Sequence, residues 1–116
     1  MKKTIAIALL AAGSFATSAL AAEVPLEKIK EKAKTCAACH GEDGNAAANP
    51  MYPRLAGQYH DYLARALHEY KSGERKNAIM AGMAAPLSEA EIDALARYFS
   101  SMPGKLDDLS KHEQGN

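Results

Sequence analysis

Two cysteines and a histidine lie within five consecutive residues of this chain, in the order Cys36, Ala37, Ala38, Cys39 and His40. Thiols separated by two residues have three common uses: a structural disulfide, a redox-active dithiol, or attachment to the vinyl groups of a c-type haem. The histidine directly after the second thiol favours haem, because its imidazole can then supply an axial nitrogen to the iron. Whatever fold the chain adopts has to present this segment to a cofactor.

The other interpretations need features that the sequence does not offer. A thioredoxin-type dithiol lies between a strand and a helix of a parallel sheet, and no segment shows the two-residue alternation of a strand. A zinc site needs four ligands, with a second Cys or His pair, and the chain has no such pair. The spacing alone leaves a simple disulfide open as the alternative to haem.

The first 21 residues have the composition of a secretory signal peptide. Lys2 and Lys3 precede an apolar run from Ile5 to about Leu20, and small residues at Ala19 and Ala21 form a cleavage site. We predict cleavage after Ala21, with Ala22 as the alternative. An uncleaved anchor is the competing interpretation, but the uninterrupted apolar part is shorter than the ~20 residues of a spanning helix. Export to the periplasm agrees with haem attachment, which bacteria complete there.

The rest of the chain is long enough for one small domain. We assign residues 22–104 to it and residues 105–116 to a polar C-terminal tail. All fourteen Asp and Glu but twelve of the fourteen Lys and Arg lie after residue 21, which makes the net charge of the mature part −2. A nucleic-acid-binding protein would show a concentrated basic face, so we expect no nucleic-acid partner. We also expect no membrane span in the mature protein.

Helical periodicity accounts for most of the domain. We predict helices from about Pro25 to about Cys36, from Gln58 to Ser72, and from Ser88 to just before Met102. Ser88 followed by Glu91 has the pattern of a capping box. The apolar residues at helical spacing are Leu26, Ile29 and Ala33, then Tyr59, Leu63, Ala66, Leu67 and Tyr70, and finally Ile92, Leu95, Ala96 and Phe99.

Two segments are predicted to be irregular loops, at residues 41–57 and 74–86. The first is rich in Gly, Asn, Ala and Pro, and the second contains two methionines but no apolar stripe. On the first helix, four lysines alternate with other residues and are expected to form a solvated face, with steering of a redox partner as the alternative. These are Lys28, Lys30, Lys32 and Lys34.

Taken together, these segments resemble the small bacterial class I (mono-haem) c-type cytochromes. The matching segments, in chain order, are Cys36 to Gly41, Asp43 to Asn45, Tyr52 to Gln58, Pro86 to Ser88, and Leu95 to Phe99. The resemblance implies an all-α fold, the class I cytochrome c fold, with three to four helices wrapped around one covalently attached haem c. The family often has a glycine where the last helix crosses the first. This chain has none there, and the small Ala33 is the candidate replacement.

The resemblance also implies His40 and a methionine as the axial iron ligands. Met80, eight residues before Ser88, matches the family's ligand, and Met83 is the alternative. Met51 precedes the proximal segment and Met102 ends the last helix, which makes both less suitable. The histidines that compete for the distal position are His60, His68 and His112, which we expect at the surface or in the tail.

Residues around the haem are implied in the same way. A backbone carbonyl in the family's Pro-x-Leu segment orients the ligating imidazole, and here Pro53 matches that proline. Leu55 would pack on the ring. Arg54 would pair with a propionate, with an exposed loop charge as the alternative, and Tyr98 matches the aromatic residue at the helix crossing.

The function implied is a soluble periplasmic one-electron carrier and not an enzyme, because two filled axial positions leave no open coordination site. Its partners would be transient electron donors and acceptors. One alternative is a haem enzyme or gas sensor with a vacant or labile distal site. The other is a haem subunit of a larger redox complex.

Overall fold

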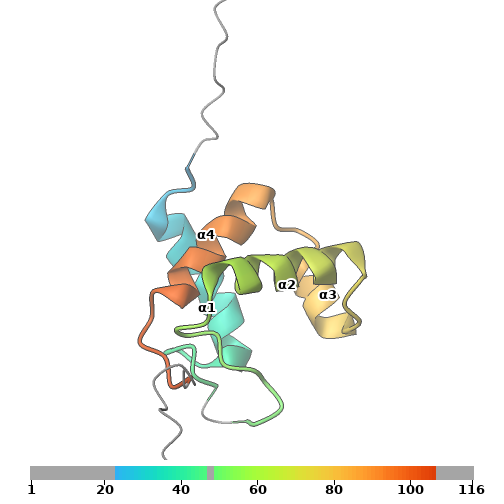
Figure 1. The fold of residues 1–116 in the computed structure, drawn as a ribbon. Helices are drawn as coiled ribbons and strands as arrows, with labels where there is room; N and C mark the ends of the chain where they lie inside the picture. Colours follow the sequence, from blue (N-terminus) through green and yellow to red (C-terminus); the bar gives the residue numbers. More distant parts are fainter. Residues whose placement is uncertain (1–22, 47–48, 107–116) are drawn as a thin grey trace, which may run out of the picture.

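The computed structural model of the protein describes residues 23–46 and 49–106. It contains four helices, α1 (Leu26–His40), α2 (His60–Ser72), α3 (Ala78–Ala84) and α4 (Glu89–Ser100), and no strand within those ranges (Figure 1). The predicted all-α fold class is therefore confirmed. The predicted signal peptide, His112 and most of the predicted tail lie outside the described residues.

Helix α1 extends one turn further than the sequence pattern predicts. The expected end was about Cys36, but the helix continues to His40. Ala37 and Ala38 are strong helix formers, and the helix ends where Gly41 takes a φ of 88° while its N–H donates to the Ala37 carbonyl, 2.8 Å away. The two thiols and the imidazole are thus presented by the last turn of one helix.

The segment predicted to be a second irregular loop contains a helix, so that prediction was wrong in part. Residues Ala78–Ala84 form α3, and the Asn77 side-chain oxygen caps it by accepting a hydrogen bond from the Met80 N–H at 3.0 Å. The helix is short and consists of small or apolar residues, so no polar and apolar faces alternate along it. Met80 and Met83 are therefore held on a helix and not on a flexible loop.

The ends of α2 and α4 follow local signals that are visible in the sequence. Helix α2 begins at His60, two residues later than predicted, and ends at Ser72, where Gly73 caps it in the left-handed conformation with φ 83°. Helix α4 begins with a complete capping box, in which Ser88 and Glu91 each bond the other's backbone N–H. The predicted capping box is confirmed.

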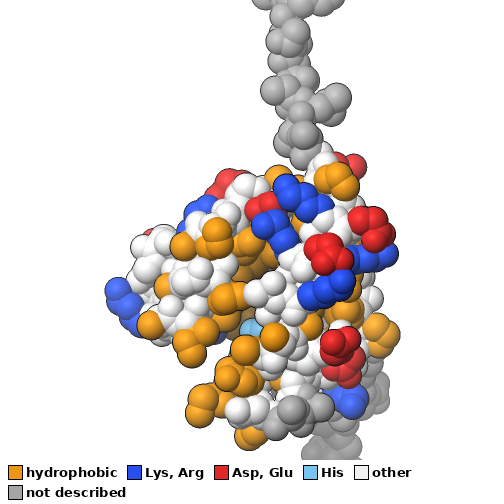
Figure 2. Space-filling view, turned by 180° about the vertical axis from the view of Figure 1, so that it is seen from behind, with side chains coloured by type: hydrophobic (Ala, Val, Ile, Leu, Met, Phe, Trp, Pro, Cys, Tyr) orange, Lys and Arg blue, Asp and Glu red, His pale blue; other side chains and the backbone are white. Residues whose placement is uncertain are grey.

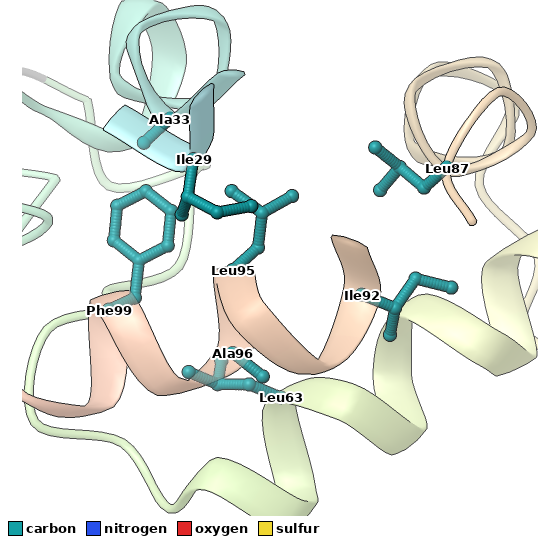
Figure 3. Close-up of a cluster of buried hydrophobic side chains, with 8 residues drawn as sticks. All are labelled: Ile29, Ala33, Leu63, Leu87, Ile92, Leu95, Ala96 and Phe99. Carbon is teal, nitrogen blue, oxygen red and sulfur yellow. The ribbon is translucent and has the colours of Figure 1, made fainter. Parts of the chain in front are cut away.

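Eight buried side chains from α1, α2, α4 and the residue before the α4 cap form the core (Figure 3). Ile29 and Ala33 of α1 lie beside Leu95 and Phe99 of α4, and Leu63 of α2 lies next to α4. Ala33 is 3% exposed, so a small residue does occupy the helix crossing where the family often has glycine.

Two residues of the predicted apolar stripes are exposed. Leu26 is 58% exposed and Tyr59 is 69% exposed. Leu26 is the first residue of α1 and Tyr59 immediately precedes α2, so each stripe becomes buried only after the helix has begun. Ile92, Leu95, Ala96 and Phe99 are all buried as predicted.

The helices pack in a line of neighbours. Helix α4 packs against both α1 and α2, and α2 packs against α3. Among these four described helices, α1 and α3 make no contact with each other (Figure 1). The segment that carries the thiols and the segment that carries Met80 are therefore placed by different parts of the core.

Candidate functional site

The His40 ring is held in one orientation by a backbone carbonyl. Its Nδ1 lies 2.7 Å from the Pro53 oxygen, and because a carbonyl can only accept, Nδ1 carries the proton and donates. The side chain is 6% exposed. The lone pair of the ring is then on Nε2, the arrangement that a histidine metal ligand adopts.

The loop that provides this carbonyl is itself fixed by hydrogen bonds to the residues just after α1. The N–H groups of Leu55 and Ala56 both donate to the Gly44 carbonyl, at 2.7 and 3.0 Å. The Arg54 Nε donates to the carbonyl of Asn45 at 3.0 Å. The Pro53 side of the His40 to Pro53 hydrogen bond is therefore tied to Gly44 and Asn45.

Asn45 has a role at this site that the sequence pattern did not predict. The pattern indicated only a turn. It is 3% exposed, and its side-chain amide donates to the carbonyls of Asp43 and Pro103 at 3.2 Å each. Its side-chain oxygen accepts from the Lys105 N–H at 2.9 Å. The residue thus joins the first loop to the chain segment that follows α4, a long-range pairing that no local signal predicts.

Arg54 makes two backbone contacts in the structure. Besides the Asn45 carbonyl, its Nη1 donates to the Lys105 carbonyl at 3.4 Å. A guanidinium has five N–H donors, so these bonds use only part of its capacity. The predicted pairing of Arg54 with a propionate stays a prediction.

No disulfide joins the two cysteines, of which Cys36 is half-buried and Cys39 exposed. Burial raises the pKa of the Cys36 thiol, which favours its neutral form. In the residues that the structure describes, no three His, Cys, Asp or Glu side chains gather that could hold a metal ion. The pair is therefore neither joined in a disulfide nor part of a zinc cluster in that part of the chain.

The two candidate distal methionines lie on α3. Met80 and Met83 are both half-buried and three residues apart, so they project from neighbouring positions of the same helix. Of the other methionines near the site, Met51 is 80% exposed, and Met102 packs against the hydrophobic core.

Two of the histidines that compete for the distal position lie close to carboxylates of α4. The His60 Nε2 lies 2.8 Å from Asp93, and the His68 Nδ1 lies 3.3 Å from Glu89. Both side chains are at the surface or its margin, as the sequence pattern predicts.

The chemistry of the donor set fits a covalently attached haem. Two free thiols and an oriented imidazole share one helical turn, and a thioether sulfur can come from a helix that α1 does not touch. The surroundings are apolar: Leu55 packs against the core, and the Tyr52 ring lies edge-on to His40, 6.3 Å between centroids. Figure 2 shows a histidine side chain at the bottom of a hollow between hydrophobic side chains.

Several characterised proteins carry similar sequences. The thiosulfate dehydrogenase electron acceptor of Thiomonas intermedia is 43% identical over 102 residues, which cover 88% of this chain and 45% of that protein. The chain spans less than half the length of several relatives that it matches, this one among them. The cytochrome subunit of sulfide dehydrogenase from Chlorobaculum tepidum is 33% identical, over 84% of this chain and 92% of that subunit.

The fold and the family agree with these similarities. The solved structure of cytochrome c4 from Acidithiobacillus ferrooxidans superimposes with a TM-score of 0.60 and 30% identity, over 69% of this chain and 51% of that one. The family model of cytochrome c matches residues 27–103, which include nearly all of the four helices. The chain therefore belongs to the cytochrome c family, and its cofactor is one covalently attached haem c.

Proposed function

We propose that the chain, after cleavage behind Ala21, is a periplasmic one-electron carrier of the class I, mono-haem type, with His40 and Met80 as the axial ligands of its iron. The observation that carries the proposal is the 2.7 Å hydrogen bond from His40 Nδ1 to the Pro53 carbonyl. It leaves Nε2 as the basic nitrogen of a buried ring, one residue from the thiol of Cys39. In this arrangement Cys36 and Cys39 hold the haem, and Pro53 orients the ligand.

The ligand pair determines what the site does. The bound haem supplies a one-electron iron couple, and a methionine sulfur opposite a histidine favours the reduced state and raises the potential. With both His40 and Met80 bound to it, the iron would have no coordination site open for oxygen or peroxide. The conclusion for this chain is an electron-transfer protein and not an enzyme.

The partners of such a carrier are an electron donor and an electron acceptor that dock transiently, since redox encounters use small interfaces. None of the helices in residues 23–46 and 49–106 has the length and apolar composition needed to cross a bilayer. The lysines of α1 contribute little free positive charge to docking, because each one lies near a carboxylate of the same chain. The pairs are Lys30 with Glu27, Lys34 with Glu31, and both Lys28 and Lys32 with Glu91.

Absorption spectra of the purified holoprotein and two methionine variants test the ligand assignment. We expect Met80→Ala to abolish the charge-transfer band of the methionine–iron bond, and the matched Met83→Ala to keep it. Loss of the band in Met83→Ala alone would move the assignment to Met83. A native high-spin spectrum with ready carbon monoxide binding would refute the carrier and support a haem enzyme or gas sensor.

A second function is favoured by one similarity: the chain spans 92% of the cytochrome subunit of sulfide dehydrogenase. The same electron-transfer domain could then be a subunit that passes electrons from a partner dehydrogenase. Size-exclusion chromatography of the native protein from its source cells decides between the two. A free carrier elutes at the mass of the mature chain, whereas a subunit co-elutes with a larger redox enzyme.

A further inference from the structure

The segment that joins α2 to α3 carries an arginine with an unusual set of contacts. The Arg75 guanidinium carbon lies 5.1 Å from the centre of the Tyr70 ring and 6.0 Å from that of the Tyr62 ring. Its Nη1 also donates to the Tyr62 hydroxyl at 3.5 Å. Tyr62 and Tyr70 are eight residues apart on α2, so they lie on the same side of that helix and the arginine contacts both.

The backbone of Arg75 is fixed to the same helix. Its N–H donates to the Glu69 carbonyl at 3.0 Å, just after Gly73 ends α2 in the left-handed conformation. The side chain is half-buried, and the hydrogen bond to Tyr62 is the main reason that the pKa of Arg75 is raised. Arg75 therefore joins the connecting segment to α2 both through its backbone and through its side chain.

Helix α3, which carries both candidate methionines, begins three residues after Arg75. Asn77, directly before the helix, caps it by accepting from the Met80 N–H at 3.0 Å. Helix α3 has seven residues and packs against α2 but against no other described helix. Such a short helix has little stability of its own, so its position depends on α2 and on the segment that connects the two (Figure 1).

We infer that Arg75 is a positioning residue for the distal ligand. By contacting both Tyr62 and Tyr70, its side chain fixes the segment that joins α2 to α3. That segment in turn holds the Asn77 cap, and with it Met80, at the iron. The inference rests on the proposed His40 and Met80 ligation. The planar guanidinium suits this position, because it stacks on aromatic faces and donates a hydrogen bond at the same time, which a lysine ammonium does less well.

Competition between Met80 and an added ligand tests the inference on the ferric holoprotein. Imidazole displaces the methionine sulfur, and the charge-transfer band reports the displacement. We expect Arg75→Ala to lower the imidazole concentration for half-displacement roughly two- to fivefold, the size of a partly exposed cation–π contact. The reduction potential of Arg75→Ala should also fall, because methionine ligation favours the ferrous state.

Matched variants separate positioning from a general effect on the fold. Arg65, an exposed arginine of α2 that pairs with Glu69, is the control, and Arg65→Ala should leave the imidazole concentration unchanged. Arg75→Lys keeps the charge, and its imidazole concentration for half-displacement should lie between those of the wild type and Arg75→Ala. If Arg75→Ala does not yield folded holoprotein, the lysine variant decides.

Two results would overturn different statements. If the folded Arg75 variants keep the imidazole concentration for half-displacement and the reduction potential of the wild type, the positioning of Met80 by Arg75 is refuted. This holds even if the melting temperatures of the variants are lower. A Met80→Ala protein that keeps its charge-transfer band would instead refute the ligand assignment itself. A third result combines loss of the band in Met80→Ala with unchanged imidazole displacement and potential in Arg75→Ala and Arg75→Lys. It would support the electron carrier and refute only the positioning role of Arg75.

Discussion

The carbonyl oxygen of Pro53 determines which nitrogen of His40 is free to bind a metal. A neutral imidazole carries its proton on one ring nitrogen, and the acceptor at 2.7 Å fixes that proton on Nδ1. The carbonyl in turn depends on Gly44 and Asn45, whose backbone oxygens accept from the residues on its C-terminal side. The His40 ring, the proposed ligand, is thus oriented through several bonds that lie outside the ring itself.

Asn45 gives the first residue-level prediction. Replacing it with alanine removes the hydrogen bonds to the Pro103 carbonyl and from the Lys105 N–H, and each such bond contributes about 0.5–1.5 kcal/mol net. We expect Asn45→Ala to lower the free energy of unfolding of the holoprotein by about 2 kcal/mol. Denaturant titration measures the change.

Gln58→Ala is the control for this prediction. The Gln58 side-chain oxygen accepts a hydrogen bond from the N–H of the next residue, Tyr59, and so joins no distant segments. Its removal should change the free energy of unfolding by less than about 0.5 kcal/mol. Equal losses in the two variants would show that Asn45 adds nothing beyond a local turn.

At the level of elements, one carboxylate connects two helices. The Glu91 side chain accepts from the Ser88 N–H at 3.1 Å, which caps α4. Its other oxygen lies 3.4 Å from the Lys28 ammonium and 3.3 Å from that of Lys32, both on α1. The start of α4 and the outer face of α1 are therefore stabilised by the same group.

The ionisation of Glu91 predicts a pH dependence of stability. The hydrogen bond from the Ser88 N–H, together with the neighbouring lysines, lowers the pKa of Glu91 in the folded protein. A lowered pKa stabilises the fold above the unfolded value of about 4.3, and this stability is lost as pH falls through the folded pKa. We expect Glu91→Gln to be less stable than wild type at neutral pH, with the difference shrinking below about pH 4.

Thermal melts of both proteins between neutral and acid pH measure this difference. Glu31→Gln removes an exposed α1 carboxylate that pairs with Lys34, and is the matched control. Exposed pairs contribute little, so its melting temperature should stay close to that of wild type. A Glu91→Gln deficit that persists unchanged in acid would show that the charge is not the cause.

The elements differ in how far the sequence predicts them. The start of α4 was predicted to within a residue, because Ser88 and Glu91 act within one turn. Helix α3 was missed, because its small and apolar residues show no periodicity and the only local signal is the capping Asn77. The motif and its resemblance to known cytochromes predicted that Pro53 orients His40, and the structure places the two in hydrogen-bond contact. Contacts between distant segments, such as those of Asn45 and Arg75, depend on how the chain folds back and carry no local pattern.

On the scale of the whole molecule, packing runs from α1 to α4, then to α2, and then to α3. The attached haem would join the two ends of this series, since its proposed ligands are on α1 and α3. Without haem, α3 keeps only its contacts with α2 among the described helices. The cofactor is therefore expected to stabilise α3 more than the pair α1 and α4, which share the core.

Removing the cofactor tests this expectation. In a Cys36→Ser, Cys39→Ser double variant produced without haem, we expect hydrogen exchange to accelerate most in residues 78–84 and least where α1 and α4 meet. Mass spectrometry of peptic fragments measures the exchange, with the holoprotein as the reference. Uniform acceleration across all four helices would show that the cofactor supports the whole fold equally.

The packing of α1 against α4 has a consequence for the order in which the protein matures. Among the described helices α1 buries its apolar face only on α4, and Glu89 lies 49 residues after His40. The helix that covers the face beneath the thiols is therefore far along the chain, and closing so long a loop comes late in folding. Until then, both thiols are accessible for haem attachment, and equally for oxidation to a disulfide with each other. The packing of α4 therefore limits the time during which the thiol of Cys36, which is half-buried in the folded protein, is fully accessible.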